Sequence, residues 1–333
     1  MSRKAPAGSE ALAEAIAGGD RRALAQGITL VESTRAEDRP RADALLETLL
    51  PRAGKSIRIG ISGAPGVGKS TFIQTFGLHV IGQGHRLAVL AVDPSSRIGG
   101  GSILGDKTRM AELAADQRAF IRPSPAGQTL GGVARRSREA LLLCEAAGHD
   151  VVLVETVGVG QSETAVADMT DMFLLLLQPG GGDELQGIKR GIVELADLLL
   201  VNKSDGDMLE AAGRTAADYQ HALRLLRPAT AGWQPEVLRC SALTGDGIPE
   251  VWKKVEAFRK SVGPKAIAER RARQARAWLK AELADSLMEV LAREPDIARR
   301  LPALEARVAA GTATPGAAAR ALLAGFLAGK TGN

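Results

Sequence analysis

The chain has 333 residues, of which 45% are hydrophobic and 24% charged, a balance typical of a globular protein and not of a disordered one. The net charge is +5, but only 3% of the residues are aromatic, so few rings could stack on bases and we expect no nucleic-acid partner. Cys144 and Cys240 are too few and too far apart for a disulfide framework, and the four scattered histidines indicate no zinc site.

The expected location follows from what the sequence lacks. No apolar stretch reaches the ~20 residues that a membrane-spanning helix needs. Residues 1–20 do not contain the apolar core of a signal peptide. We therefore expect a cytoplasmic protein in a reducing compartment, with no membrane contact and with both cysteines packed as small core residues.

Residues 1–52 are predicted to form a helical N-terminal extension. Apolar residues recur there at near-helical spacing, at Leu12, Ile16, Leu24, Ile28 and Val31. Gly18 and Gly19 interrupt the pattern, and the segment RADALLETLL repeats it. The segment is expected to cover the domain that follows.

Residues 53–262 alternate short apolar runs with helical segments. The runs read SIRIGIS, RLAVLAVD, AFIRP, DVVLVET, MFLLLLQ, ADLLLVN and EVLRCSA. Several are continuously hydrophobic, which indicates strands buried on both faces. The alternation predicts an α/β fold, a doubly wound and mostly parallel sheet.

Residues 263–333 contain no strand-like run and are predicted to be a helical arm. Leu279, Leu283, Leu287 and Leu291 recur every four residues, a stripe that must be buried against something. The stripe could pack on the preceding domain or against a second copy of the chain. Thr314 and Pro315 are typical of the start of a last helix.

A phosphate-binding loop is the most specific motif of the chain. The pattern G-x-x-x-x-G-K-[ST] is matched in full by Gly63, Ala64, Pro65, Gly66, Val67, Gly68, Lys69 and Ser70. It follows a predicted strand and precedes a predicted helix, as the motif requires. Backbone N–H groups and the helix N-terminus would hold the phosphates. Lys69 would bridge the terminal phosphates, Ser70 would bind Mg²⁺, and Thr71 would contact an inner phosphate.

A second motif indicates guanine as the base. Asn202, Lys203 and Asp205 form N-K-x-D after a buried strand. The Asp205 carboxylate can accept hydrogen bonds from the guanine ring N–H and amine, whereas adenine would present an acceptor to it. Asn202 is expected at the base edge and the Lys203 stem over its face. The triplet Ser241, Ala242 and Leu243 follows the last strand, where a backbone N–H can contact the guanine carbonyl.

Three carboxylates are candidates for a magnesium site. Asp93 and Glu155 each follow a predicted strand, and Asp106 follows a glycine-rich stretch. Together they could surround one Mg²⁺ through water. Asp93 could instead activate the attacking water, and Asp106 could be an ordinary turn residue. Gly158 stands in E-x-x-G, where nucleotide switches sense the last phosphate.

The same switch predicts slow hydrolysis. Val159 follows Gly158, and its side chain cannot orient a water molecule as glutamine does in many GTPases. Gln161 could do so only from two residues later. The loop QPGGGDELQGIKRG at 178–191 could supply the missing charge, through Lys189 or Arg190, or could be an ordinary surface loop. We expect a slow GTPase that a partner stimulates.

The motifs GISGAPGVGKST, AVDPSS, LGDKTRM, ETVGVGQSE, QPGGGDELQGIKRG and VNKSD, in this order, resemble one known family. It is the family of metallochaperone-type P-loop GTPases that serve adenosylcobalamin-dependent methylmalonyl-CoA mutase, also labelled lysine/arginine/ornithine transport-system kinases. The resemblance covers about the whole chain. It implies a GTPase that binds GTP, GDP and Mg²⁺, and a homodimer formed by the C-terminal helices.

The resemblance also implies a function and several residue roles. The protein would bind the mutase, gate delivery of its cobalamin cofactor, and protect or reactivate the enzyme. The acids matching Asp93, Asp106 and Glu155 serve the Mg²⁺ site in the family. The loop matching 178–190 acts there as a further switch, and Lys189 matches a lysine that is important for partner-stimulated hydrolysis. Glu155 and Val159 both fit the family.

Other functions stay open at the level of sequence. A metal-insertion GTPase of the nickel type would share the mechanism, but it usually carries clustered histidines or cysteines. A kinase of a transport protein is the older label, and Asp205 argues for guanine over adenine there. The run RRARQAR at 270–276 would suit a ribosome-linked GTPase, although such runs are more often the solvated face of a helix.

Overall fold

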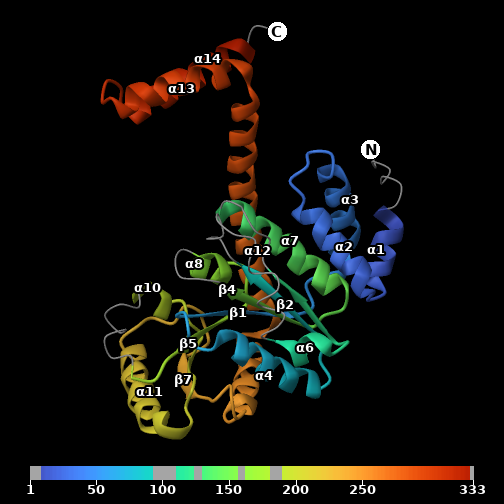
Figure 1. The fold of residues 1–333 in the computed structure, drawn as a ribbon, viewed down its shortest axis with the longest axis vertical. Helices are drawn as coiled ribbons and strands as arrows, with labels where there is room; N and C mark the ends of the chain where they lie inside the picture. The colour runs from blue at the N-terminus through green and yellow to red at the C-terminus, as the bar shows by residue number, and fades with distance from the viewer. Residues whose placement is uncertain (1–8, 93–109, 124–129, 157–161, 181–189, 331–333) are drawn as a thin grey trace. The chain divides into compact units, whose positions relative to one another are not determined.

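The computed structural model describes residues 9–92, 110–123, 130–156, 162–180 and 190–330. The chain forms two compact units, residues 1–274 and 275–333 (Figure 1). The N-terminal helices and the sheet belong to the first unit. The three-part division at 52 and 262 stays a prediction.

The first three helices pack together and onto the domain, as the apolar spacing predicts. They are α1 (Ser9–Ala17), α2 (Arg21–Glu32) and α3 (Arg39–Leu49), followed by the 3₁₀ turn η1 (Leu50–Arg52). Asp20 caps α2, because its carboxylate accepts hydrogen bonds from the backbone N–H groups of Arg22 and Ala23. These bonds lower the pKa of Asp20. Arg39 of α3 binds Glu139 of helix α7 (Leu130–Ala146) at 2.7 Å, which fixes the extension to the domain.

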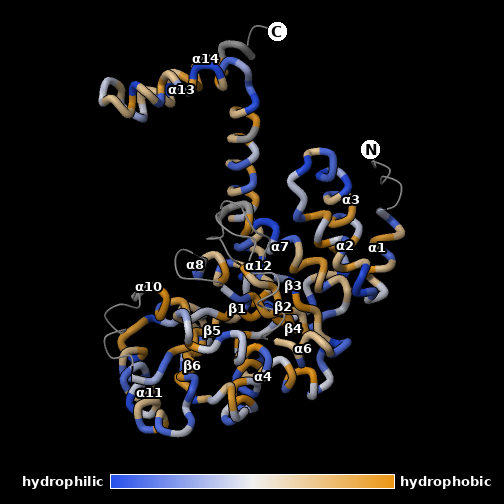
Figure 2. Tube along the Cα trace, viewed as in Figure 1, coloured by the Kyte–Doolittle hydropathy of each residue, from blue (hydrophilic) through white to orange (hydrophobic). Residues whose placement is uncertain are grey.

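The seven predicted strands are confirmed and form one sheet. They are β1 (Ile57–Gly63), β2 (Leu87–Val92), β3 (Ala119–Arg122), β4 (Val151–Thr156), β5 (Met172–Leu177), β6 (Leu198–Val201) and β7 (Glu236–Arg239). The order is β3-β2-β4-β1-β5-β6-β7, and every pairing is parallel. All residues of β1, β2, β4, β5 and β6 are buried. Burial on both faces explains why β2, β5 and β6 consist of hydrophobic residues only (Figure 2).

Helices cover both faces of the sheet. In chain order they are α4 (Lys69–Gly82), α6 (Ala111–Ala115), α7 (Leu130–Ala146), α8 (Ser162–Ala167), α10 (Arg190–Val193), the 3₁₀ turn η2 (Gly206–Met208), α11 (Leu209–Leu223) and α12 (Ile248–Arg293). Helix α4 and the first part of α12 share a core with Ile57, Ile59 and Ile61 of β1. Side chains alternate between the faces of a strand, and α8 packs over Gly60, so α8 lies on the opposite face (Figure 1).

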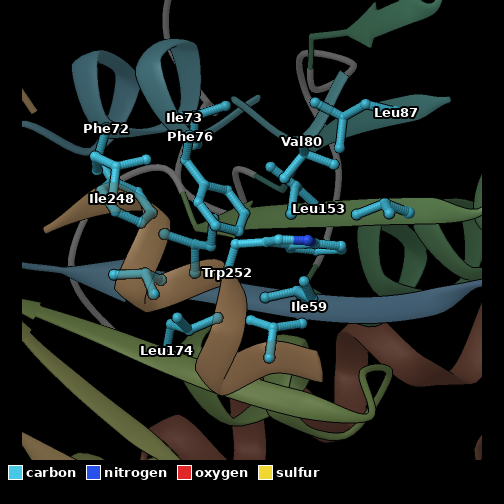
Figure 3. Close-up of a cluster of buried hydrophobic side chains, with 14 of the residues drawn as sticks. Ile59, Phe72, Ile73, Phe76, Val80, Leu87, Leu153, Leu174, Ile248 and Trp252 are labelled. Atoms are coloured by element: carbon cyan, nitrogen blue, oxygen red, sulfur yellow. The ribbon is translucent and has the colours of Figure 1, made fainter. Parts of the chain in front are cut away.

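Aromatic side chains are concentrated in the core between α4 and α12. Phe72 and Phe76 stack at 5.3 Å between ring centroids, and Trp252 lies 6.0 Å from Phe76. Figure 3 shows the Trp252 ring between Phe76 and the strand residue Ile59. Both cysteines are buried, as expected, and burial raises the pKa of Cys240 to about 12.

Charged groups are buried at the amino ends of the strands. Arg58 of β1 donates two hydrogen bonds to Glu145, at 2.9 and 2.8 Å. Burial works to raise the pKa of Glu145, but the Arg58 bonds outweigh it and hold that pKa below its usual value. Asp171 and Asp197, which precede β5 and β6, are at most 1% exposed.

Helix α12 supplies the partners of these two aspartates. Arg271 donates to both carboxylate oxygens of Asp171, at 2.8 and 2.6 Å. Arg270 lies 3.9 Å from Asp197, and Gln274 donates to the Thr170 carbonyl at 2.9 Å. The interpretation of 270–276 as a solvated helix face is therefore wrong for these three residues.

The second unit is helical, as predicted. It contains the end of α12, α13 (Pro295–Ala309) and α14 (Pro315–Lys330). The Thr314 hydroxyl accepts a hydrogen bond from Ala317 N, which confirms the expected start of α14. Leu279, Leu283 and Leu287 are 69%, 60% and 52% exposed in the single chain, so the predicted stripe is available for contact. Among the described residues, none of the helices has the length and hydropathy to span a membrane.

Candidate functional site

The candidate site lies where the central strands end at their carboxyl side. Strand β1 is flanked by β4 and β5, and the loops after β1, β4 and β6 carry the predicted motifs. In open parallel sheets ligands bind at this edge, because loops converge there beside helix N-termini. The topology therefore brings motifs from distant parts of the chain together.

The phosphate loop has the curled backbone that its motif predicts. Gly66 and Gly68 have φ of 80° and 93°, which favours glycine, and Gly68 directly precedes α4. A Cβ on Gly63 would lie 2.6 Å from the Leu176 carbonyl oxygen, and one on Gly68 would lie 2.8 Å from the Asn202 amide nitrogen. Glycine is thus required both for conformation and for space.

Lys69 is held by the loop itself. Its Nζ donates to the carbonyl of Gly63 at 2.7 Å and to that of Ala64 at 3.4 Å. Burial lowers the pKa of Lys69, while the nearby Glu155 and Glu163 carboxylates act to raise it. The cation therefore already lies over the loop, where phosphate oxygens could replace the two carbonyls as its acceptors.

Two buried carboxylates lie near Lys69. Glu155 pairs in register with Ile61 of β1 and is 4% exposed. Beside it, the Thr156 hydroxyl donates to Ser62 at 3.0 Å and ties β4 to β1. Glu163, in the first turn of α8, is 5% exposed. Sequence reasoning missed Glu163, although an acid at the start of the helix after the switch is a usable signal.

Asn202 ties the phosphate loop to the base loop. Its amide nitrogen donates to the Val67 carbonyl at 2.8 Å, and its amide oxygen accepts from Ala242 N at 3.0 Å. The side chain is 1% exposed, so these bonds are made in a low-dielectric environment. Sequence reasoning expected Asn202 at the base edge and missed this role, and the base contact stays a prediction.

Lys203 and Asp205 frame the expected base position. Lys203 has a φ of 57°, and its Nζ donates to the Gly66 carbonyl at 2.8 Å, so its stem crosses toward the phosphate loop. Asp205 is half-buried, and none of the bonds recorded within the described ranges engages its carboxylate. Its oxygens are therefore available to a ligand with adjacent N–H donors.

The base loop after β7 is closed by its own hydrogen bonds. Ser241 is fully buried, and its hydroxyl accepts from Thr244 N at 3.1 Å. The Thr75 hydroxyl of α4 donates to the Ala242 carbonyl at 2.7 Å, a contact that sequence reasoning did not predict. Leu243 is 80% exposed. The loop is thus fixed to the phosphate-binding helix at Ala242, whereas Leu243 is exposed to solvent.

Several predicted site residues lie outside the described residues, namely Asp93, Asp106, Gly158 and Lys189. Within the described residues, no group of three histidines, cysteines or acids could hold a metal ion. Ser70 in the first turn of α4 and the buried Glu155 provide oxygen donors at this edge. These are the ligand atoms that Mg²⁺ prefers, so the two described residues fit the ion.

The fold and the site together define a P-loop nucleotide-binding protein, and its relatives identify the activity. The chain is 47% identical over 282 residues to the GTPase ArgK of Escherichia coli, covering 84% of this chain and 85% of that one. A crystal structure described as LAO/AO transport system kinase superposes with a TM-score of 0.77 at 37% identity. The match covers 98% of this chain and 100% of the chain in that crystal structure. The protein is a P-loop GTPase.

The family follows from a match to a family model. Residues 24–296 match the family described as methylmalonyl-CoA mutase-associated GTPase MeaB, and the chain belongs to this family. The protein named methylmalonic aciduria type A homolog, mitochondrial, from Mus musculus is 50% identical over 319 residues. That alignment covers 92% of this chain and 77% of the mouse protein. The resemblance drawn from the motifs is therefore confirmed.

Proposed function

We propose that this GTPase is a chaperone of an adenosylcobalamin-dependent methylmalonyl-CoA mutase. It gates the loading of the cobalamin cofactor, and it protects the mutase or reactivates it. The observation that carries the proposal is the match over residues 24–296 to a family described by its association with that mutase. The name of the mouse relative, methylmalonic aciduria type A homolog, agrees with it.

The nucleotide site supplies the chemistry. The N–H groups of the loop 63–70 and the cation of Lys69 hold the phosphates and stabilise the charge that develops during hydrolysis. Asp205 selects guanine by accepting from its two N–H groups. Ser70 and Glu155 would hold Mg²⁺ with Asp93 and Asp106, and the ion would neutralise phosphate charge there.

Hydrolysis is slow in the isolated protein and faster in the complex. Val159 offers no group to orient water, so part of the catalytic site must be completed when the mutase binds. Lys189 is the residue of this chain proposed to respond to that partner. The protein acts in the cytoplasm as a homodimer in which the exposed stripe with Leu279 and Leu283 pairs with its copy.

The test is steady-state GTP hydrolysis with and without the mutase. The rate should rise about tenfold or more on addition of the mutase, equivalent to roughly 1.4 kcal/mol of transition-state stabilisation. Lys189→Ala should keep the basal rate and lose the stimulation. An unchanged rate, with no complex on gel filtration, would remove the mutase as partner and leave the GTPase.

A kinase function is the second candidate, because the structurally similar crystal structure bears that description. A GTPase and a kinase differ in the group that receives the terminal phosphate of GTP. GTP labelled on that phosphate should release only inorganic phosphate if the proposal holds, and a labelled protein band would favour the kinase. A nickel-type metal-insertion GTPase would instead bind nickel with a defined stoichiometry in equilibrium dialysis.

A further inference from the structure

A cavity of about 880 Å³ opens at the edge of the sheet opposite to the nucleotide site. Its inner side is formed by Ile57 and Val151, the paired first residues of β1 and β4, and by His85 before β2. The rest of its wall comes from α12 and from residues 54–56, which precede β1. The cavity shares no residue with the phosphate loop or the base loop, so it is a separate site.

The shape of the cavity results from the kink in α12. The first helical segment contributes one face, with residues at the spacing 252, 255, 256, 259 and 260. The second segment contributes residues 264, 267, 268 and 271, again one face. Gly263 joins the segments with φ of 76° and ψ of 161°, a conformation that only glycine adopts readily. Both faces are thereby directed into the same cavity.

The walls are fixed before any ligand arrives. The Arg271 guanidinium donates to the carbonyls of Gly54 and Ser56, both at 2.6 Å, and binds the buried Asp171. These bonds hold the second segment of α12 against the start of β1. On the other side, Trp252 is 6% exposed and packs against Phe76 and His85. A preformed cavity can bind a ligand without the entropic penalty of ordering its walls.

The charges around the cavity are not balanced. Three cationic side chains at the cavity are exposed, those of Lys55, Arg259 and Lys260. Within the described ranges these side chains make no hydrogen bond or ion pair. Among the lining residues Glu256 is the one acid. Arg271 is already neutralised by Asp171. Three available cations therefore lie near one carboxylate, beside an apolar wall that includes Ile57, Val255 and Ile267.

We propose that this cavity binds a small organic anion with an apolar, ring-sized body and a carboxylate or phosphate group. The volume falls in the range of small-molecule sites, roughly 300–1,000 Å³, which combine apolar walls with a few polar groups. The apolar body lies along Ile57 and Ile267 near the edge of Trp252, and the anionic group faces Arg259 and Lys260. The ligand thus bridges the sheet and the base of α12.

The first test uses the fluorescent anion anilinonaphthalenesulfonate with the full-length protein saturated with GDP. One site per chain is expected, and Lys260→Glu should weaken it about tenfold, because an attraction becomes a repulsion. The matched control is Lys253→Glu, on the same helix but outside the cavity, where Lys253 pairs with Glu250 at 3.7 Å. The control should bind as the wild type does. Equal weakening by both variants would reduce the effect to net charge and overturn the proposal.

The second test fills the cavity. Ala268→Trp should abolish the site, whereas Ala257→Trp, exposed on the same helix away from the cavity, should preserve it. Unchanged binding to Ala268→Trp would place the probe on exposed apolar residues such as Leu283 and contradict the proposal. The neutral analogue phenylnaphthylamine should bind about tenfold more weakly, since it lacks the charge.

Competition then identifies the anionic group. Displacement of the probe by octanoate would assign a carboxylate, and displacement by phenyl phosphate would assign a phosphate ester. Failure of both to compete would contradict an organic-anion site. If nucleotide-free protein loses its bound probe when GDP is added, the probe occupies the nucleotide site instead, which would contradict the proposal.

Discussion

The two edges of the parallel sheet use their polar groups in opposite ways. At the carboxyl edge, Lys69 donates to loop carbonyls that a phosphate could replace, and within the described ranges no hydrogen bond or ion pair engages the Asp205 carboxylate. At the amino edge, the buried charged groups bind one another: Arg58 pairs with Glu145, and Arg271 with Asp171. Groups that are already paired in a buried network stabilise a structure, whereas groups left available can bind a ligand.

Lys69→Ala should cause the largest change in nucleotide affinity and should affect the carboxyl edge alone. Loss of the cation over the phosphate loop should weaken GDP binding about a thousandfold, roughly 4 kcal/mol. Titration with a fluorescent guanine nucleotide measures this. Lys253→Ala, on the exposed face of α12, is the control and should bind normally. A variant Lys69→Ala that keeps its affinity would contradict the assignment of the phosphate loop.

Arg271→Met should affect the amino edge alone. The change leaves the Asp171 carboxylate, which is fully buried, without its charged partner, and this should lower the free energy of unfolding by about 3 kcal/mol. Urea denaturation of the full chain measures the loss. Arg273→Met, two residues away and exposed, should unfold like the wild type. GDP affinity should stay unchanged, and a parallel loss of affinity would break the distinction between the edges.

Asp205→Asn should change specificity without changing stability. Replacing the carboxylate by an amide removes the acceptor for the guanine N–H groups, so GTP affinity should fall about a hundredfold and xanthosine triphosphate should bind better. Competition between the two nucleotides measures the switch. Unchanged preference would refute the base-selecting role of Asp205.

His149, at the amino edge, should make the stability of the protein depend on pH. The side chain is 3% exposed before β4, and burial lowers its pKa from 6.5 to about 4. Above pH 6.5 the residue is neutral in both states and stability is unaffected. Below it, only the unfolded chain takes up the proton, so stability falls as the pH drops towards 4, by about 2 kcal/mol at pH 5.

His149→Gln, which keeps a donor for the Cys144 carbonyl, should remove this part of the pH dependence. Urea denaturation at pH 7 and pH 5 compares the variant with the wild type. The control is His221→Gln in α11, because His221 is exposed. An identical pH dependence in His149→Gln and the wild type would show that other groups cause it.

Much of the nucleotide site could be predicted because its residues are contiguous. The phosphate loop and N-K-x-D each lie within a few residues, and local backbone geometry requires the glycines of the phosphate loop. The contacts of Asn202 with Val67 and Ala242 could not be predicted, because they join three separate segments. Glu163 was not predicted, for a related reason: only the position of α8 in the fold brings its carboxylate near Lys69.

The amino edge was the least predictable region. The run 270–276 looks like a charged solvent face. Only the position of α12 at the amino ends of the strands shows that Arg270 and Arg271 are paired with buried aspartates. Asp171 and Asp197 likewise resemble ordinary residues at the ends of turns. A pattern of charges along a helix indicates which side is polar, but not which polar groups find partners.

Four features could be predicted from the sequence: the seven strands, their mostly parallel arrangement, the GTPase class and the family. Hydrophobic periodicity and contiguous motifs are local properties of the chain, so they indicate these features directly. The pairing of the polar groups and the cavity at the kink of α12 result from tertiary packing. Those features depend on side chains that are far apart in the chain, such as Arg271 and Gly54. Only packing brings such residues within hydrogen-bond distance, so no local sequence pattern predicts these contacts.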